Sequence, residues 1–141
     1  MIEFGNTAHG AAIAAAIPRR FNPACDRVIS NVAETGELLG GVIYDGYTQN
    51  CIFMHQAGFH PRWMTRELLW IVFDYPFNKL GCAKVCGTIP SDAVELLEFN
   101  RRLGFKVETK ITDAYPSADM LILSMRREDC RWLERKSTRY R

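Results

Sequence analysis

The sequence lacks the long apolar run that a membrane span requires. None of its apolar runs reaches the roughly 18 residues expected of a membrane-spanning helix. The Ala-rich segment at residues 11–17 is short and has no basic residues leading into it, unlike a signal peptide. We therefore expect a protein that has no membrane partner and resides in the cytoplasm.

Paired cysteine motifs and clustered histidines are also missing. The five cysteines form no Cys-x-x-Cys pair, and His9, His55 and His60 are not at the spacing of metal ligands on a helix. Most of the cysteines lie in apolar, strand-like segments, which is typical of buried, reduced thiols in a reducing compartment. We expect neither a structural disulfide nor a metal site.

Little net charge is present, but the basic residues are unevenly distributed. The formal net charge is +2, yet residues 126–141 contain seven Arg and Lys side chains against three acidic ones. A basic tail can attract nucleic acid or an acidic partner. A solvated terminal helix over residues 129–136 with a frayed end is the simpler interpretation, and we favour it for residues 127–141.

The remaining composition is that of one globular domain. With 141 residues, of which 48% are hydrophobic, the chain can bury a core without disulfides. Alternating and apolar runs predict strands at residues 2–4, 28–33, 38–44, 51–56, 83–89, 105–112 and 120–126. Gly and Asn in the connections of the second, third and fourth of these favour an antiparallel meander.

Three helices are predicted between these strands. The first follows Asn6 or Thr7 and runs to residue 16, before Pro18. The second runs from Thr65 to Gly81, with a kink at Pro76 because a proline ring removes the hydrogen bond to the carbonyl four residues earlier. The third covers residues 92–103 and ends at Leu103-Gly104-Phe105, where Gly104 suits the left-handed position after a helix. We expect an α/β (α+β) domain with a mixed, twisted sheet of six to seven strands and helices on both faces.

The order strand, helix, Leu-Gly-Phe, strand, preceded by a strand that breaks into a long helix, resembles the C-terminal half of the GNAT (Gcn5-related N-acetyltransferase) superfamily. Small RimJ/RimL-like members encoded by bacteriophages are especially similar. They share the segment Phe-Asp-Tyr-Pro-Phe at residues 73–77 and a C-terminal pattern carried here by Met125, Cys130, Trp132 and Leu133. The resemblance covers residues 28–133. It implies direct transfer of an acetyl group from acetyl-CoA to a primary amine of a small molecule or protein, without a metal, in the host cytoplasm if a phage encodes the chain.

The resemblance also implies a coenzyme A site at the start of the second long helix. Backbone N–H groups and the dipole of a helix N-terminus suit a pyrophosphate. The family pattern is Gln or Arg, two residues, Gly, one residue, then Gly or Ala, and here Thr65 and Glu67 stand where the glycines fall. Arginine side chains can supply charge-assisted bonds instead. The implied cofactor-binding residues are Arg62, Trp63, Met64, Thr65, Arg66 and Glu67, with Ser91 near the start of the next helix, where the family's asparagine falls at Ala93.

For the acetyl group, the resemblance assigns the strand segment Met54, His55, Gln56 and Ala57. The pKa range of histidine suits a general base, so His55 is a candidate for that role. The alternative is a buried histidine whose nitrogens bond to the backbone. The family's tyrosine, four residues before the glycine of Leu-Gly-Phe, is replaced by Asn100, whose amide can bond to the sulfur but is not an acid.

Other readings of the sequence stay open. The acceptor pocket is expected from residues 19–25 and the turns at Asp45 and Tyr115, which do not identify the amine. The missing glycines and tyrosine also suit an acyl-CoA-binding module without turnover. The arginine-rich tail suits a nucleic-acid-associated or nucleobase-modifying protein on the same fold. An exposed aromatic surface around Trp63, Trp70 and Phe77 would favour a homodimer.

Overall fold

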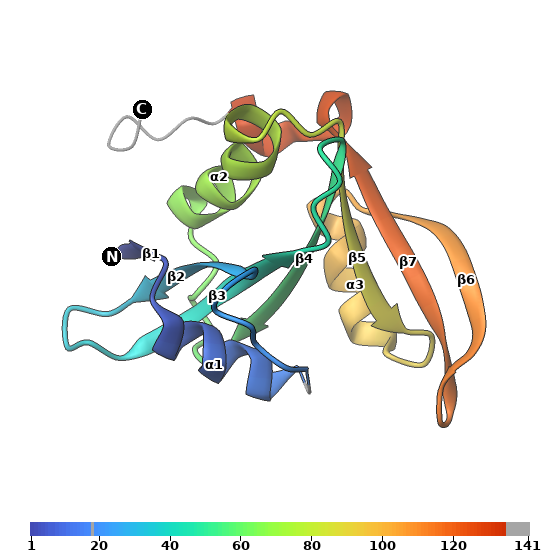
Figure 1. Ribbon diagram of the computed structural model, residues 1–141, viewed down its shortest axis with the longest axis horizontal. Coiled ribbons are helices and arrows are strands. Elements are labelled where there is room, and N and C mark those ends of the chain that lie inside the picture. The colour runs from blue at the N-terminus through green and yellow to red at the C-terminus, as the bar shows by residue number, and fades with distance from the viewer. Residues whose placement is uncertain (18, 135–141) are drawn as a thin grey trace.

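The computed structural model describes residues 1–17 and 19–134 of the chain. Seven strands form one mixed sheet in the order β1-β2-β3-β4-β5-β7-β6 (Figure 1). This confirms the predicted α/β domain and its sheet. The strands are β1 (Ile2–Phe4), β2 (Arg27–Val32), β3 (Leu38–Asp45), β4 (Cys51–Gly58), β5 (Lys84–Pro90), β6 (Lys106–Tyr115) and β7 (Ala118–Arg126).

Strands β2, β3 and β4 form the predicted antiparallel meander, and β1 pairs antiparallel with β2 at its edge. Gly36 and Gly46 take φ angles of 91° and 64° in its two tight connections, a conformation that favours glycine. In the C-terminal part of the sheet, β7 lies between β5 and β6 and is antiparallel to both. The sheet therefore consists of two antiparallel halves.

The two halves meet along a short parallel pairing of β4 with β5. Only residues 51–53 of β4 pair with residues 84–86 of β5. Beyond these residues β4 stays paired with β3 and β5 with β7, so the two strands separate, as Figure 1 shows. The separation opens a V in the middle of the sheet.

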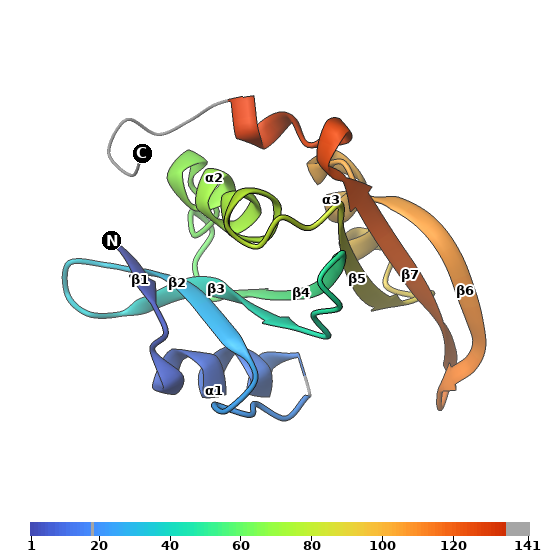
Figure 2. The same cartoon turned by 45° about the horizontal axis from the view of Figure 1, so that its top comes forward.

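Helices cover both faces of the sheet, as predicted (Figure 2). Helix α1 (Thr7–Ala16) packs Ile13 and Ala14 against Val28 and Ile43 on one face. Helix α2 (Arg66–Asp74) covers the opposite face, where alternate residues such as Val42 and Tyr44 point. Because neighbouring strand residues face opposite sides, β2 and β3 supply apolar contacts to both layers.

Proline 76 interrupts the long helix as predicted, and a distant side chain compensates for the lost hydrogen bond. After α2 the chain continues as a π-helix, η1 (Tyr75–Lys79). Pro76 has no N–H to donate to the Val72 carbonyl. The hydroxyl of Tyr44 donates to that carbonyl instead, at 2.5 Å. Burial, together with the nearby Tyr75 and Asp74, raises the pKa of Tyr44 well above its ordinary value, so the hydroxyl remains a donor.

The third helix, α3 (Val94–Leu103), ends as the sequence predicts. Gly104 has a φ of 115°, and both Gly104 N and Phe105 N donate to the Asn100 carbonyl. The helix starts two residues later than predicted. The following β6 extends to Tyr115, beyond the predicted end at residue 112, because it pairs with β7 up to the hairpin turn.

The predicted helix over residues 129–136 is wrong for its described part. The chain instead forms two short 3₁₀ helices, η2 (Arg127–Asp129) and η3 (Arg131–Glu134), separated by an extended Cys130. The indole N–H of Trp132 donates to the Leu103 carbonyl at 2.8 Å, and Arg131 donates to the Arg102 carbonyl. The segment is thus fixed to the C-terminus of α3. Pro18 and residues 135–141, which hold much of the basic tail, lie outside the described residues.

The predicted exposed aromatic surface is also wrong. Trp70 and Phe77 are buried, with 6% and 1% of their surface exposed. Trp63 packs against Gly40 and Gly58, where a Cβ atom at Gly58 would lie 2.0 Å from the indole nitrogen. The expectation of a homodimer therefore loses its basis.

All five cysteines are free thiols. Cys82, Cys86 and Cys130 are buried as predicted, whereas Cys25 is exposed because it lies in the loop after α1. Among the described helices, none has the length and apolar character needed to cross a membrane.

Candidate active site

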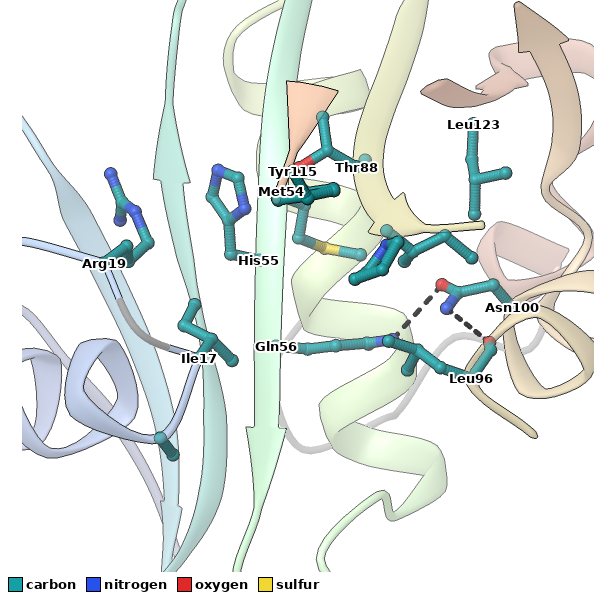
Figure 3. A pocket seen from close by; sticks show the side chains of 14 residues that line it. Ile17, Arg19, Met54, His55, Gln56, Thr88, Leu96, Asn100, Tyr115 and Leu123 are labelled. Atoms are coloured by element: carbon teal, nitrogen blue, oxygen red, sulfur yellow. Dashed lines mark hydrogen bonds between the residues drawn. The ribbon is translucent and has the colours of Figure 1, made fainter. Parts of the chain in front are cut away.

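A pocket of about 640 Å³ lies where β4 and β5 separate. Figure 3 shows side chains from β4, β5, α3 and the segment after α1 around it. Its lining residues are Ala16, Ile17, Arg19, Met54, His55, Gln56, Gly87, Thr88, Ile89, Pro90, Leu96, Asn100, Tyr115 and Leu123. The pocket is largely apolar, with a few polar side chains, as small-molecule sites usually are.

A connected network of polar side chains forms the side of this pocket next to β4 and the segment after α1. His55 Nε2 lies 3.0 Å from Asp45 Oδ1, and Arg19 Nη2 lies 2.5 Å from Asp45 Oδ2. Arg19 is also 3.5 Å from Asp26, whose carboxylate accepts a hydrogen bond from Asn22 N. Both oxygens of Asp45 are thus engaged, one by the imidazole and one by the guanidinium.

Strand register explains why these residues meet. In the β3–β4 pair, Ile43 lies opposite His55 and Asp45 lies opposite Phe53. Asp45 and His55 therefore share a face as diagonal neighbours, within reach of a long side chain. Arg19 follows α1, which packs on this same face.

Electrostatics keep Asp45 ionised. Burial alone raises the pKa of this carboxyl, but the hydrogen bond and charge of His55 and the charge of Arg19 outweigh burial and lower the pKa below its ordinary value. A carboxylate can only accept hydrogen bonds. When the imidazole of His55 is neutral, this carboxylate selects the tautomer with the proton on Nε2 and the lone pair on Nδ1. The ring is fixed as a base at one defined atom.

Neutral amides from β4 and α3 meet across the V. Gln56 Nε2 donates to Asn100 Oδ1 at 3.2 Å, and Asn100 Nδ2 donates to the Leu96 carbonyl at 2.8 Å, as the dashed lines in Figure 3 show. Asn100 is 7% exposed and is therefore held rigidly. This contact joins β4 to α3 where the backbone pairing of β4 with β5 has ended.

Buried polar atoms without a partner cluster at this pocket. In residues 1–17 and 19–134, three such side-chain atoms occur: Arg19 Nη1, Gln56 Oε1 and Trp70 Nε1. Arg19 and Gln56 both line the pocket. Unpaired buried polar groups are costly, and each needs a specific explanation. A bound ligand that accepts a bond from Arg19 and donates one to Gln56 would satisfy both.

The predicted phosphate-binding residues lie apart from the pocket, at the start of α2. Thr65 is the N-cap, and its hydroxyl accepts from Leu68 N at 3.2 Å. Within the described part of the chain, the N–H groups of Arg66 and Glu67 have no hydrogen-bond acceptor. Arg62 and Arg66 are exposed. These groups are available to an anion, while the carboxylate of Glu67 in the first turn opposes one.

Of the predicted site residues, the structure brings Met54, His55, Gln56 and Asn100 together in one pocket. Ala57 instead packs against the α1 cluster, and Ser91 bonds to Asp119 N through its hydroxyl at 3.0 Å. The predicted phosphate residues and Ser91 do not line the pocket. They are Arg62, Trp63, Met64, Thr65, Arg66, Glu67 and Ser91.

The sequence left two features of the pocket unassigned. Thr88 carries no local motif, and the ion pair of Arg19 with Asp45 joins residues 26 positions apart. Only the general expectation of an acceptor pocket from residues 19–25, Asp45 and Tyr115 pointed to this region. Arg19 and Tyr115 do line the pocket.

Known structures provide the comparison for this architecture. Neither a protein-family model nor the sequence of a curated protein matches the chain. A mutant form of the spermidine/spermine N-acetyltransferase SpeG from Vibrio cholerae is similar, with a TM-score of 0.63 and 15% identity over 80% of this chain and 72% of that chain. A structure described as a probable acetyltransferase has a TM-score of 0.63 and 15% identity over 74% and 62% of the two chains. The chain has the GNAT fold.

The GNAT fold of this chain places the pocket at the V between its central strands. At 15% identity, the structural similarity establishes the fold alone. The substrate has to be inferred from the residues of this chain. One similar SpeG structure contains manganese ions. In this chain, no group of three His, Cys, Asp or Glu side chains among the described residues is arranged to hold a metal.

Proposed function

We propose that this protein is an N-acetyltransferase that moves the acetyl group of acetyl-CoA directly to a primary amine. One observation supports the proposal most strongly: His55 lines the pocket between β4 and β5 of a GNAT fold, and Asp45 orients its imidazole. Transfer to an amine requires a neutral nitrogen nucleophile, and this network supplies a group that accepts the proton.

His55 has the catalytic role in this proposal. Its Nδ1 accepts a proton from the acceptor ammonium, and the freed nitrogen attacks the thioester carbonyl carbon. The new carbon–nitrogen bond forms as the carbon–sulfur bond breaks, the thiolate leaves, and the second proton of the attacking nitrogen passes to that thiolate, which gives the amide and the free thiol. A thiol with a pKa of about 8.5 is a fair leaving group even without an acid. Asn100 lines the same pocket, and in this proposal the second hydrogen of its amide bonds to the sulfur.

Acetyl-CoA, the acetyl donor, fits the gap between β4 and β5 and the start of α2. The edges of β4 and β5 beyond Phe53 and Cys86 have no partner strand, so their polar groups can pair with an extended, amide-containing arm. Met54, Gln56 and Ala57 belong to this stretch, and Gln56 Oε1 can accept from a ligand N–H. Arg62 and Arg66, with the free N–H groups of α2, suit the pyrophosphate. Trp63, Met64, Thr65, Glu67 and Ser91 shape that end of the site.

A discriminating experiment compares acetyl-CoA with acetylpantetheine, which lacks the pyrophosphate. We expect calorimetry to detect acetyl-CoA binding to the wild type. Arg62→Ala combined with Arg66→Ala should weaken binding of acetyl-CoA and leave acetylpantetheine unaffected. Arg102→Ala, an exposed arginine on α3, is the matched control and should bind as the wild type does.

Thiol release across a panel of amines then tests transfer. Thiol release that requires both an amine and His55 supports the proposal that the protein is an enzyme. Binding of acetyl-CoA without release for any amine would favour the alternative, an acyl-CoA-binding module that has lost turnover. Absence of acetyl-CoA binding by calorimetry and mass spectrometry would refute the proposal.

A further inference from the structure

Arg19 lines the pocket and carries a buried donor that has no partner in the described part of the chain. Its Nη2 pairs with Asp45, while its Nη1 is buried without a partner in the described part of the chain. Figure 3 shows the guanidinium beside the imidazole of His55. Because one carboxylate holds both groups, the free Nη1 and the base are fixed relative to each other.

The charges that line the pocket have one sign. No Asp or Glu is among its described lining residues, and Arg19 is the one that carries a permanent charge. Asp45 is not among the lining residues, and its two oxygens already bond to His55 and to Arg19. Among the described lining residues, an incoming cation therefore meets a guanidinium and no carboxylate.

We propose that the acceptor is a primary amine that also bears an oxygen acceptor, a carboxylate or an amide carbonyl, and that this oxygen bonds to Arg19 Nη1 while the nitrogen lies at His55 Nδ1. The proposal rests on the acetyltransferase function above and specifies its substrate class. Arg19 thereby determines specificity. The apolar side chains of Ile17 and Leu96 contact the carbon skeleton between the two groups.

Polyamines do not meet these requirements. At neutral pH their nitrogens are ammonium groups, which donate hydrogen bonds and accept none. A diamine would leave Arg19 Nη1 unpaired and bring a second positive charge towards it. The proposal thus separates this chain from the similar structures described as spermidine acetyltransferases.

Matched amines of equal length test the inference. One series contains butylamine, 1,4-diaminobutane, 4-aminobutanoate and 4-aminobutanamide, and a shorter series contains ethylamine, 1,2-diaminoethane, glycine and glycinamide. We expect kcat/KM for thiol release to be about 10- to 100-fold higher for an oxygen-bearing member than for the simple amine of its series. The diamine should be the poorest. Comparing the acid with the amide shows whether a carboxylate or a carbonyl is preferred.

Variants at position 19 assign that preference to Arg19. In Arg19→Ala and Arg19→Lys, the ratio of kcat/KM between the oxygen-bearing amine and the simple amine should fall to near one. Lost positioning of His55 would slow every amine equally and leave the ratio intact, so the ratio separates specificity from structure. Arg20→Ala, an exposed neighbour, should keep the wild-type ratio. Thermal unfolding confirms that each variant folds.

Two outcomes would overturn the inference: a wild type that prefers diamines or simple amines, or a preference that survives in both Arg19 variants. Acetyl-CoA binding, measured separately, keeps the two proposals distinct. If acetyl-CoA binds and only diamines react, acetyl transfer stands and the acceptor class is wrong. If acetyl-CoA does not bind, acetyl transfer is wrong. NMR-detected binding of the same amines, with and without Arg19, then decides the inference.

Discussion

The two walls of the pocket differ in how they are built. The wall from β4 and the α1 side carries a network of charged groups, His55, Asp45 and Arg19, drawn from three separate segments. The wall from β5 and α3 carries Thr88, Ile89, Leu96 and a neutral amide, Asn100, whose polar contacts are an amide and a carbonyl.

This difference indicates that the two walls have different roles. Groups that can take up a proton and bind a charged or polar acceptor occur on the first wall, while the second wall offers shape and neutral hydrogen bonds. If transfer occurs here, proton chemistry depends on the first wall. Substitutions on the two walls should then have unequal effects.

Removal of the base should have the largest effect. For His55→Ala we expect kcat/KM for acetyl transfer to fall by about 10²- to 10⁴-fold, the usual contribution of general base catalysis. The measurement is thiol release at saturating acetyl-CoA. His9→Ala is a matched control, because His9 is comparably buried, with 15% of its side chain exposed against 17% for His55, and bonds to Ser30 outside the pocket. Equal losses in both variants would contradict a catalytic role.

Loss of the positioning carboxylate should have the next largest effect. Asp45→Asn removes a charge-assisted hydrogen bond and permits either tautomer of His55, so we expect a loss of about 10- to 100-fold in kcat/KM. The pH–rate profile is the informative readout, because a purely structural role would leave its shape unchanged. A variant with the wild-type profile would argue against positioning by Asp45.

The same residue makes stability depend on pH. Because the folded pKa of Asp45 is below its ordinary value, its carboxylate stabilises the fold at neutral pH, and this contribution is lost as pH falls from about 4 through the lowered pKa. Chemical unfolding at several pH values should therefore show a difference between wild type and Asp45→Asn that shrinks in acid. A constant difference would contradict this account.

On the opposite face of the sheet, between β3 and α2 and outside both walls, Tyr44→Phe should reduce stability without loss of activity. The change removes the hydroxyl that donates to the Val72 carbonyl, which costs about 0.5–1.5 kcal/mol of unfolding free energy. Denaturant unfolding measures the loss. Tyr75→Phe, a tyrosine whose ring contacts Tyr44, is the control and should change stability less. If both variants unfold alike, the hydroxyl is not what supports the interrupted helix.

These contacts also show what could be predicted from the sequence. Alternating apolar residues predicted the meander, and Gly104 and Pro76 marked the end of one helix and the interruption of another, because each constraint acts within a few residues. The partner of the Val72 carbonyl could not be predicted. It comes from a side chain 28 positions away, which only the packed sheet brings close.

Some features of the candidate site could likewise be predicted from local sequence, and others could not. The family resemblance placed His55 and Asn100 in the pocket through the local register of β4 and α3. The ion pair of Arg19 with Asp45 depends on how α1 packs across β3, and no local pattern reports that packing. Likewise, the extended Cys130 reflects bonds from Arg131 and Trp132 to the end of α3, which override the helical composition of that segment.

The smallest effect is expected on the second wall. Asn100→Leu keeps the number and branching of the side-chain heavy atoms but removes the amide, and we expect kcat to fall by less than about 10-fold, because a thiol with a pKa of about 8.5 leaves without an acid. Stability should fall modestly, since Gln56 Nε2 loses its acceptor. Thiol release measured beside His55→Ala gives the comparison. If Asn100→Leu slowed thiol release as much as His55→Ala does, both walls would carry essential chemistry. A neutral amide can have so large an effect only if it assists the departing sulfur.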